Sequence, residues 1–209
     1  MGKMAVRDPY NPNHDPLLIV ISGPSGVGKD SVVKCLMERG YPFHFVVTAT
    51  SRAPRVGEVN GVDYFFVSET AFEQMIREDE LLEHALVYGQ HKGIPKQQVR
   101  EALSSGKDVV MRLDVQGAAT VKALVPDAVL IFLSPASEEE LARRLSLRNT
   151  ETEQQLRERL LLIRDEMARL REFDYVVVNA DCKLDKAVDK VLAIIQSEHC
   201  RVYPRQVTL

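Results

Sequence analysis

The residues GPSGVGK at 23–29 constrain the fold more than any other feature of the sequence. They follow the apolar run LLIVIS at 17–22 and precede a helical pattern that begins near Asp30. In a G-x-x-x-x-G-K loop the glycines let backbone N–H groups turn inward around phosphate oxygens, and the lysine reaches the β and γ phosphates. A glycine-rich turn that only joins strand to helix is the alternative, which the strand-turn-helix setting disfavours. The expected nucleotide contacts are Gly23, Pro24, Ser25, Gly26, Val27, Gly28, Lys29, Asp30 and Ser31.

Asp30 occupies the position at which such loops normally carry Ser or Thr. The usual hydroxyl ligates Mg²⁺, whereas a carboxylate beside a triphosphate repels it unless a cation intervenes. Because Mg²⁺ prefers oxygen ligands, we expect Asp30 to bind the metal directly or through water and to make nucleotide affinity more dependent on Mg²⁺. The alternative is that Asp30 only complements the positive end of the following helix. Ser31 lies one residue further around the helix and does not simply replace the missing hydroxyl.

Four apolar, β-rich runs recur along the chain, and runs of this kind favour a parallel sheet that is covered on both faces. They lie at 17–22, 108–114, 128–134 and 175–180. Helical patterns separate them, marked by the capping boxes of Ser137 with Glu140 and of Thr152 with Gln155, and by the periodic segment 184–195. Strands that alternate with helices predict a doubly wound α/β core.

Between about residues 44 and 95 the pattern changes to short strand-like runs that are separated by Gly and Asn turns. The runs are FVVTATSR at 45–52, DYFFVS at 63–68 and LLEHALVYG at 81–89, and the helical stretch ETAFEQMIRED at 69–79 interrupts them. We expect this region to form a small inserted lobe with a mostly antiparallel sheet.

Charge and hydropathy limit the classes of partner. The chain has 27 Lys and Arg against 30 Asp and Glu, a net charge of -3, so it lacks the global basic field that draws proteins nonspecifically onto nucleic acid. Its apolar runs are far shorter than the roughly 20 residues of a membrane span. Cys35, Cys182 and Cys200 show no metal-ligand spacing. Residues 1–16 lack the pattern of a signal peptide or a full transit peptide, and we expect a flexible lead. No nucleic-acid or membrane partner is expected.

Arginines form a second group of candidate phosphate ligands. Arg52 and Arg55 lie three residues apart, with Tyr64 following, and paired guanidiniums with a phenol suit a phosphate dianion. Later arginines are Arg143, Arg144, Arg148, Arg157 and Arg159. In isolation such a run is typical of a solvated helix face. Beside a phosphate loop, it is a candidate for a lid that carries Arg148 and Arg159 over a transferred phosphoryl group.

Five motifs in this order resemble the guanylate kinase family over nearly all of residues 17–199. They are GPSGVGK, TSRAPRVGEVNGVDYFFV, LLEHALVYG, LDVQG and RNTETEQQLRERL. FVVTATSR, HKGIPK and YVVVNA, with Asp in the loop, most resemble plant members directed to chloroplasts and mitochondria. The resemblance implies those compartments, with cytoplasm as the alternative, and a P-loop nucleoside-monophosphate kinase fold. The implied parts are a lead at 1–16 and a kinase domain at 17–209, with core 17–43 and 96–209, GMP-binding lobe 44–95 and lid about 144–160.

The resemblance also implies roles for individual residues. The implied GMP contacts are Thr48, Arg52, Arg55, Tyr64, Glu83, Lys92 and Asp114. Arg144 and Asn179 are implied to join the loop in binding ATP with Mg²⁺, and Lys29, Arg148 and Arg159 to be catalytic. Guanine offers N1–H and N2–H₂ donors that adenine lacks, so carboxylates of Glu83 and Asp114 left unpaired by AMP would discriminate by about 10²-fold or more. The chain departs from the family pattern at Thr48, Lys92, Ile94 and Arg112, the last of which replaces a usual Asp.

The expected activity is phosphorylation of GMP, and of dGMP, by ATP. The alternative of another class is an inactive guanylate-kinase-like scaffold that binds phosphoproteins through Arg52, Arg55 and Tyr64. The intact Lys29 and the arginine-rich lid favour the enzyme. An enzyme for another acceptor, such as AMP, is a further alternative that Glu83 and Asp114 disfavour. The sequence leaves open whether the chain is a monomer or a weak dimer.

Overall fold

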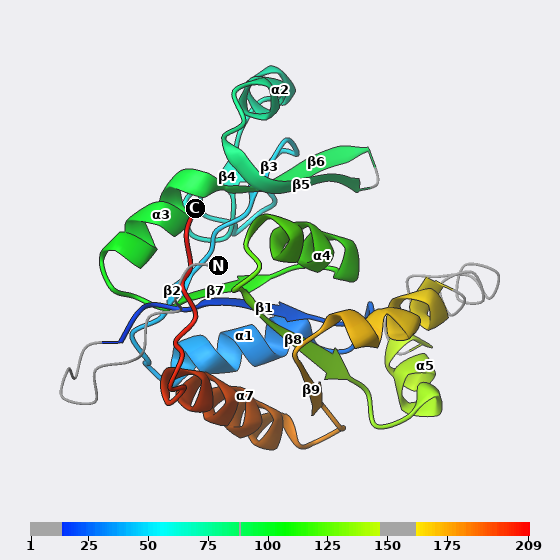
Figure 1. Ribbon diagram of the computed structural model, residues 1–209. Helices are drawn as coiled ribbons and strands as arrows, with labels where there is room; N and C mark the ends of the chain where they lie inside the picture. Colours follow the sequence, from blue (N-terminus) through cyan, green and yellow to red (C-terminus); the bar gives the residue numbers. More distant parts are fainter. Residues whose placement is uncertain (1–13, 88, 147–161) are drawn as a thin grey trace.

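The computed structural model describes residues 14–87, 89–146 and 162–209, and it contains a five-stranded core sheet and a separate four-stranded sheet (Figure 1). The core sheet is parallel and has the strand order β2-β7-β1-β8-β9. Its strands are β2 (His44–Phe45), β7 (Val109–Arg112), β1 (Leu18–Ser22), β8 (Val129–Ser134) and β9 (Tyr175–Val178). The four apolar runs form all of these strands except β2, and the predicted α/β fold is confirmed.

Helices cover both faces of the core sheet, α1 and α7 on one side and α3 and α4 on the other (Figure 1). Their bounds are α1 (Lys29–Glu38), α7 (Leu184–His199), α3 (Lys96–Ser104) and α4 (Val115–Leu124). Alternate residues of β1 pack into different apolar clusters: Ile19 and Ile21 lie with α1 and α7, whereas Leu18 and Val20 lie with α3 and α4. Both faces are buried, which explains why the strand sequence is continuously apolar.

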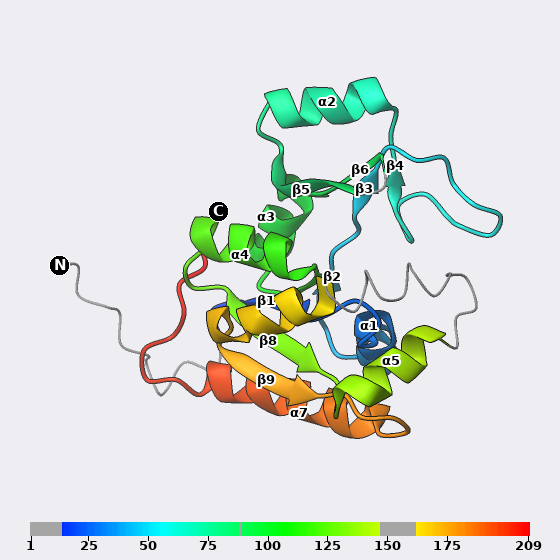
Figure 2. The same ribbon diagram turned by 90° about the vertical axis from the view of Figure 1, so that its right-hand side faces the viewer.

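The second sheet and helix α2 form a lobe that stands above the core (Figure 2). Its strand order is β4-β3-β6-β5. The elements are β3 (Ala49–Thr50), β4 (Phe65–Phe66), α2 (Glu69–Arg77), β5 (Leu81–Val87) and β6 (Gln90–Pro95). Two of the three strand pairings are antiparallel and the β3-β4 pairing is parallel. Phe72 of α2 is buried with Ala49 and Leu81, so the lobe has a small apolar core of its own.

Strand β2 lies outside the lobe although the expected lobe spans 44–95, and strand β6 lies inside it but was not expected to be a strand. The run FVVTATSR contributes to both sheets, because His44–Phe45 pairs with β7 in the core and the lobe sheet begins at Ala49. Gln98 of α3 holds the chain between them: its side chain accepts from the N–H of Val47 at 2.9 Å and donates to the Val47 carbonyl at 2.7 Å. β6 was not anticipated, since its Lys, Gly and Pro have low strand propensity, and its pairing with β5 and β3 overrides that local preference.

Helix α5 (Glu138–Ser146) begins where the sequence predicts, because Ser137 Oγ accepts from the Glu140 N–H at 3.2 Å. The second capping box, Thr152 with Gln155, lies outside the described residues. A further helical stretch at 162–168 runs into the short 3₁₀ helix η1 (Arg169–Glu172). In the described part of the chain, no helix combines the length and apolar character that a bilayer crossing requires.

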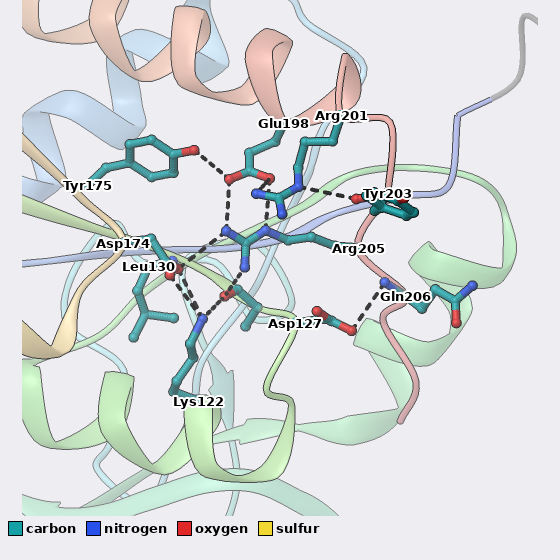
Figure 3. Close-up of polar contacts among 11 residues, drawn as sticks. Lys122, Asp127, Leu130, Asp174, Tyr175, Glu198, Arg201, Tyr203, Arg205 and Gln206 are labelled. Atoms are coloured by element: carbon teal, nitrogen blue, oxygen red, sulfur yellow. Dashed lines mark hydrogen bonds and ion pairs between the residues drawn. The ribbon is translucent and has the colours of Figure 1, made fainter. Parts of the chain in front are cut away.

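The C-terminal tail, residues 201–209, runs from α7 toward the face of the sheet that α3 and α4 cover (Figures 1 and 3). Val207 and Leu209 pack against the apolar cluster of that face. Arg205 donates two hydrogen bonds of 2.8 Å to the buried carboxylate of Glu198, and the Tyr175 hydroxyl donates a third at 2.6 Å. The tail therefore connects α7 to the opposite side of the sheet.

Candidate functional site

The loop between β1 and α1 has backbone conformations that require glycine. Gly28 has a φ of 95° directly before α1, in the left-handed region, and a Cβ there would lie 2.7 Å from Nδ2 of Asn179. Gly23 has a φ of 138°, and its Cβ would collide with the carbonyl oxygen of Leu133 in β8. The turn thus packs against two neighbouring strand ends and leads into the helix N-terminus, which is the geometry of an anion-binding loop.

Arg144 and Asn179 hold this loop through its backbone. Both donate to the carbonyl of Val27, Asn179 Nδ2 at 2.8 Å and Arg144 Nη1 at 3.1 Å. Arg144 also donates to the carbonyl of Asn179 at 2.7 Å and to Asp181 at 2.7 Å, and it pairs with Glu140. The sequence predicts these two residues as ATP contacts, and the structure brings them to the loop itself. Asp181 and Glu140 were not anticipated as partners of Arg144.

Two further contacts involve the loop. Glu166, in the helical stretch 162–168, accepts from the N–H of Ser25 at 3.0 Å. Lys29 bends back over the loop and donates to the carbonyls of Gly23 at 2.6 Å and Pro24 at 3.2 Å. The contact shows that a loop N–H donates a hydrogen bond to an anionic group, and Glu166 is a residue that the motif analysis missed.

A cavity of about 220 Å³ lies where the loop, the core sheet and the lobe meet. Six of the predicted site residues line it: Lys29, Thr48, Tyr64, Glu83, Lys92 and Asp114. The other lining residues are Ala85, Gly93, Ile94, Arg112 and Leu113. Ile94 is only 1% exposed and belongs to the core cluster under α3 and α4. The cavity thus combines an apolar wall with charged groups of both signs, which is typical of a binding site for a small polar molecule.

Glu83 and Asp114 form the acidic side of the cavity. Burial raises the pKa of Glu83 to about 7, and the charge of Asp114 adds to this effect. Asp114 caps α4, with Oδ1 accepting from the N–H of Gly117 at 2.7 Å. A Cβ on Gly117 would lie only 3.2 Å from Oε1 of Glu83, so this glycine gives the Glu83 carboxylate its space. The carboxylates of Glu83 and Asp114 line the same cavity, where they can accept hydrogen bonds from N–H groups of a nucleobase.

Arg52 and Tyr64 form a cationic and aromatic group with Glu58, which sequence reasoning missed. Arg52 donates to both carboxylate oxygens of Glu58, at 2.7 and 2.5 Å, and lies 4.8 Å from the centre of the Tyr64 ring. The bonds from Arg52 and from the Arg55 N–H lower the pKa of Glu58 to about 2. Burial lowers the pKa of Lys92, and the charges of Arg52 and Arg55 lower it further. Lys92 therefore lies close enough to Arg52 and Arg55 for their charges to disfavour its own, as in a site that receives an anion.

Asp30, the predicted metal ligand, forms an ion pair with Arg112 at the end of β7. Its side chain is 78% exposed in the first turn of α1, beside Lys29, and the neighbouring Ser31 is exposed as well. Within the described ranges, no cluster of three or more His, Cys, Asp or Glu could hold a metal by itself. A single hard oxygen ligand beside a phosphate loop fits Mg²⁺, which commonly takes one or two carboxylates and completes its shell with phosphates and water.

The lid residues Arg148 and Arg159 lie outside the described residues. Arg143 and Arg144, at the end of α5, both pair with Asp181 after β9. Arg144 is therefore bonded to the core beside the loop with its side chain 17% exposed, whereas the side chain of Arg143 is 60% exposed and reaches Asp181 from the surface.

Comparisons with known proteins extend over the loop, the lobe and the core. The family model described as "Guanylate kinase" matches residues 16–198. "Guanylate kinase 2, chloroplastic/mitochondrial" of Oryza sativa subsp. japonica is 49% identical over all of this chain and 74% of its own length. "Guanylate kinase" of Halalkalibacterium halodurans is 46% identical over 88% of this chain and 90% of its own. The crystal structure of guanylate kinase from Anaplasma phagocytophilum has a TM-score of 0.72 at 29% identity, covering 90% of this chain and 89% of that one.

Proposed function

The chain belongs to the guanylate kinase family, and from that premise we propose how its own residues bind and align the two substrates. Its activity is that of a guanylate kinase, the phosphorylation of GMP. The observation that carries the proposal is one cavity whose lining combines Lys29 of the phosphate loop with Glu83, Asp114 and Lys92 on the acceptor side.

In this proposal, Glu83 and Asp114 accept hydrogen bonds from the guanine base. Asp114 has Oδ2 for the base while Oδ1 caps α4, and Ile94 provides the apolar wall. AMP would leave both acids without donors, and a buried acceptor without its donor costs affinity, so the site selects guanine. Thr48 lines the same space beside the base. Because these contacts address the base, we include dGMP among the acceptors.

The phosphate of GMP binds the opposite side of the site, between Arg52, Arg55, Lys92 and the Tyr64 hydroxyl. Glu58 orients Arg52 by its two hydrogen bonds and so fixes the guanidinium before the ligand arrives. Burial, and after it the charges of Arg52 and Arg55, lower the pKa of Lys92, and the charged form of Lys92 is favoured again when a dianion enters. The free energy of that interaction contributes to binding of the nucleotide over the nucleoside.

ATP binds through the loop of residues 23–31, whose N–H groups surround its phosphates while Lys29 leaves its loop carbonyls for the β and γ phosphates. Arg144 and Asn179 serve ATP binding by holding the Val27 carbonyl. Asp30 would hold Mg²⁺ together with the phosphates, and the metal would neutralise negative charge on the phosphate groups. Arg148 and Arg159 close over the transferred group as parts of the lid.

The transfer itself is an in-line displacement. A phosphate oxygen of GMP bonds to the γ phosphorus while the bond from that phosphorus to the oxygen of the leaving ADP breaks, so the products are GDP and ADP. The attacking phosphate is largely ionised at neutral pH, with a second pKa of about 6, so no residue must act as an obligate general base. Arg52, Arg55 and Tyr64 align the acceptor, and Lys29 stabilises the charge of the donor.

We further propose that the enzyme acts in chloroplasts and mitochondria, on the basis of the rice relative whose name places that protein there. The test is a fusion of the full-length protein to a fluorescent reporter, imaged in plant cells beside markers of both organelles. A signal confined to the cytoplasm contradicts this part of the proposal and leaves the enzymatic part unaffected.

The enzymatic proposal is tested by ADP release from ATP and Mg²⁺ on addition of GMP, dGMP or AMP. We expect turnover with the two guanine nucleotides, at least about 10²-fold less with AMP, and loss of turnover in Lys29→Met. Tight GMP binding without turnover in the wild type would contradict catalysis and support a binding scaffold. Equal turnover with AMP would contradict the roles of Glu83 and Asp114.

A further inference from the structure

Arg112 lies between the donor and acceptor sides of the site. It is the last residue of β7, the strand that lies beside β1 (Figure 1), and it pairs in register with Ile21, two residues before Gly23 and the phosphate loop. Its side chain also lines the cavity, together with Lys29 on the donor side and Tyr64 on the acceptor side. A cation at this position is within the volume that receives phosphate groups.

In this structure, Arg112 forms an ion pair with Asp30. The guanidinium and the carboxylate are in direct contact, and the side chains are 37% and 78% exposed respectively. Ion pairs with this much exposure to water contribute little stability, because water competes for both partners. A stronger partner for either group can therefore separate the pair at a small cost in free energy.

The carboxylate occupies a different position here from that in P-loop enzymes in general. P-loop enzymes in general hold Mg²⁺ with the hydroxyl that follows the loop lysine and with a carboxylate from a neighbouring strand. Here the carboxylate follows the lysine, and the neighbouring strand carries an arginine. The pair sums to zero charge, whereas the general arrangement carries one negative charge. Arg112 thereby neutralises the carboxylate of Asp30, which would otherwise repel phosphate, and its guanidinium can itself bind a phosphate group.

We propose that Arg112 is an additional ligand for the phosphate of the acceptor nucleotide, and that Asp30 holds it back until the metal-bound donor occupies the loop. Asp30 then turns to the donor complex, and Arg112 bonds to the acceptor phosphate in the cavity. The inference rests on the proposed function, since it assumes that GMP occupies this cavity.

The consequence is coupling between the two substrates. In the absence of donor, part of the affinity for the acceptor phosphate is lost because Asp30 competes for Arg112. Once the donor is bound, that competition ends. Binding of one substrate therefore strengthens binding of the other by the same factor, as linkage requires.

The test is the dissociation constant of GMP, measured by calorimetry on the full chain with and without Mg²⁺ and a non-hydrolysable ATP analogue. We expect the donor complex to tighten GMP binding about tenfold in the wild type, within the usual range of coupling. Arg112→Gln is expected to bind GMP weakly in both states. Asp30→Ser is expected to bind GMP tightly without donor and to show little further gain. The double variant Asp30→Ser with Arg112→Gln is expected to match Arg112→Gln for GMP.

Guanosine and a remote ion pair provide the controls. Guanosine lacks the phosphate, so its affinity is expected to be the same in wild type and Arg112→Gln. Arg39→Gln removes an exposed cation that pairs with Asp185 and Asp189 at the far end of α1, and it is expected to change neither affinity nor coupling. Thermal melts of each variant establish that the fold is retained.

Three results would overturn the proposal. The first is unchanged coupling in Arg112→Gln, and the second is an equal loss of guanosine and GMP affinity. The third is weakened binding of the ATP analogue alone with GMP binding unchanged, which assigns Arg112 to the donor phosphates instead. Each of these is compatible with wild-type turnover of GMP, so failure of this inference is distinguishable from failure of the proposed function.

Discussion

Glu83 carries the ionisation that recognition of guanine depends on. Burial and the nearby charge of Asp114 raise its pKa to about 7, so the carboxyl group is neutral below neutrality and ionised above it. Only the ionised form presents two acceptor oxygens, since the protonated form places a hydrogen on one of them. Guanine presents N–H donors to Glu83. The ionised carboxylate, which prevails at higher pH, is therefore the form that binds guanine.

We expect the dissociation constant of guanosine to rise about tenfold between pH 8 and pH 6, because the ionised fraction of a group with a pKa near 7 falls from about 0.9 to about 0.1 over that interval. Guanosine is preferred to GMP for this measurement, since a phosphate monoester itself titrates near pH 6. Calorimetric titrations at four pH values give the profile. Glu83→Gln, which has no proton to lose in this range, is expected to bind more weakly at pH 8 and to show no pH dependence. A wild-type profile as flat as that of Glu83→Gln would rule out the role.

For individual residues, the sequence predicts which side chains belong to the site better than it predicts which side chains they contact. Lys29, Glu83 and Asp114 follow from motifs, and all three line one cavity. The contact between Asp30 and Arg112 joins positions 82 residues apart, and it exists because β7 lies directly beside β1 in the sheet. Local patterns do not encode strand order, so this pairing could not be read from the sequence.

Among the secondary-structure elements, the first turn of α4 positions both acids of the cavity. Its cap fixes Asp114, and Gly117 in the same turn leaves room for the carboxylate of Glu83. Glycine inside a helix costs about 1 kcal/mol relative to alanine, so its presence here reflects the close approach of β5 rather than helix stability. The final glycine of LDVQG thus has a steric reason that the motif alone does not reveal.

Gly117→Ala is expected to weaken guanosine binding about three- to tenfold, because the added methyl group would sit 3.1 Å from Cδ of Glu83 and force the carboxylate to shift. Stability is expected to stay the same or rise by up to about 1 kcal/mol, since alanine favours the helix. Guanosine titration and thermal melts separate the two effects. Thr120→Ala, an exposed change on the same helix, is the matched control: it is expected to leave guanosine affinity unchanged and to raise stability by about 0.5 kcal/mol through helix propensity alone. Unchanged guanosine affinity in Gly117→Ala would contradict the steric role.

The sequence predicts those strands that are buried under helices, because burial requires a run of apolar residues. β1, β7, β8 and β9 are covered on at least one face by helices, and their apolar runs show it. β2 and β3 are two residues long each, and the division of FVVTATSR between two sheets depends on Gln98 holding Val47. That side chain comes from a helix about 50 residues later, so no local pattern reports it.

For the whole molecule, the C-terminal tail joins parts of the core that the sheet separates. Glu198 at the end of α7 has a fully buried side chain, and Arg205 returns from the tail to bond it (Figure 3). Burial alone would raise the pKa of Glu198, but the hydrogen bonds from Arg205 and Tyr175 outweigh it and lower the pKa. The carboxylate is therefore held in its charged form inside the protein and depends on its partners to remain there.

Arg205→Met is expected to lower the free energy of unfolding by about 3 kcal/mol or more, because it leaves the charge of Glu198 buried without its main partner. Urea unfolding followed by circular dichroism gives the value. Arg201→Met is the matched control: Arg201 approaches the same carboxylate at 3.6 Å, but its side chain is 47% exposed, so its loss is expected to cost about 0–1 kcal/mol. The affinity for GMP is expected to be unchanged in both, since neither residue lines the cavity. If the two variants were equally stable, the tail contact would be an ordinary surface ion pair. Pairing Arg205→Met with Glu198→Gln should restore part of the loss, because the second change removes the unpaired charge.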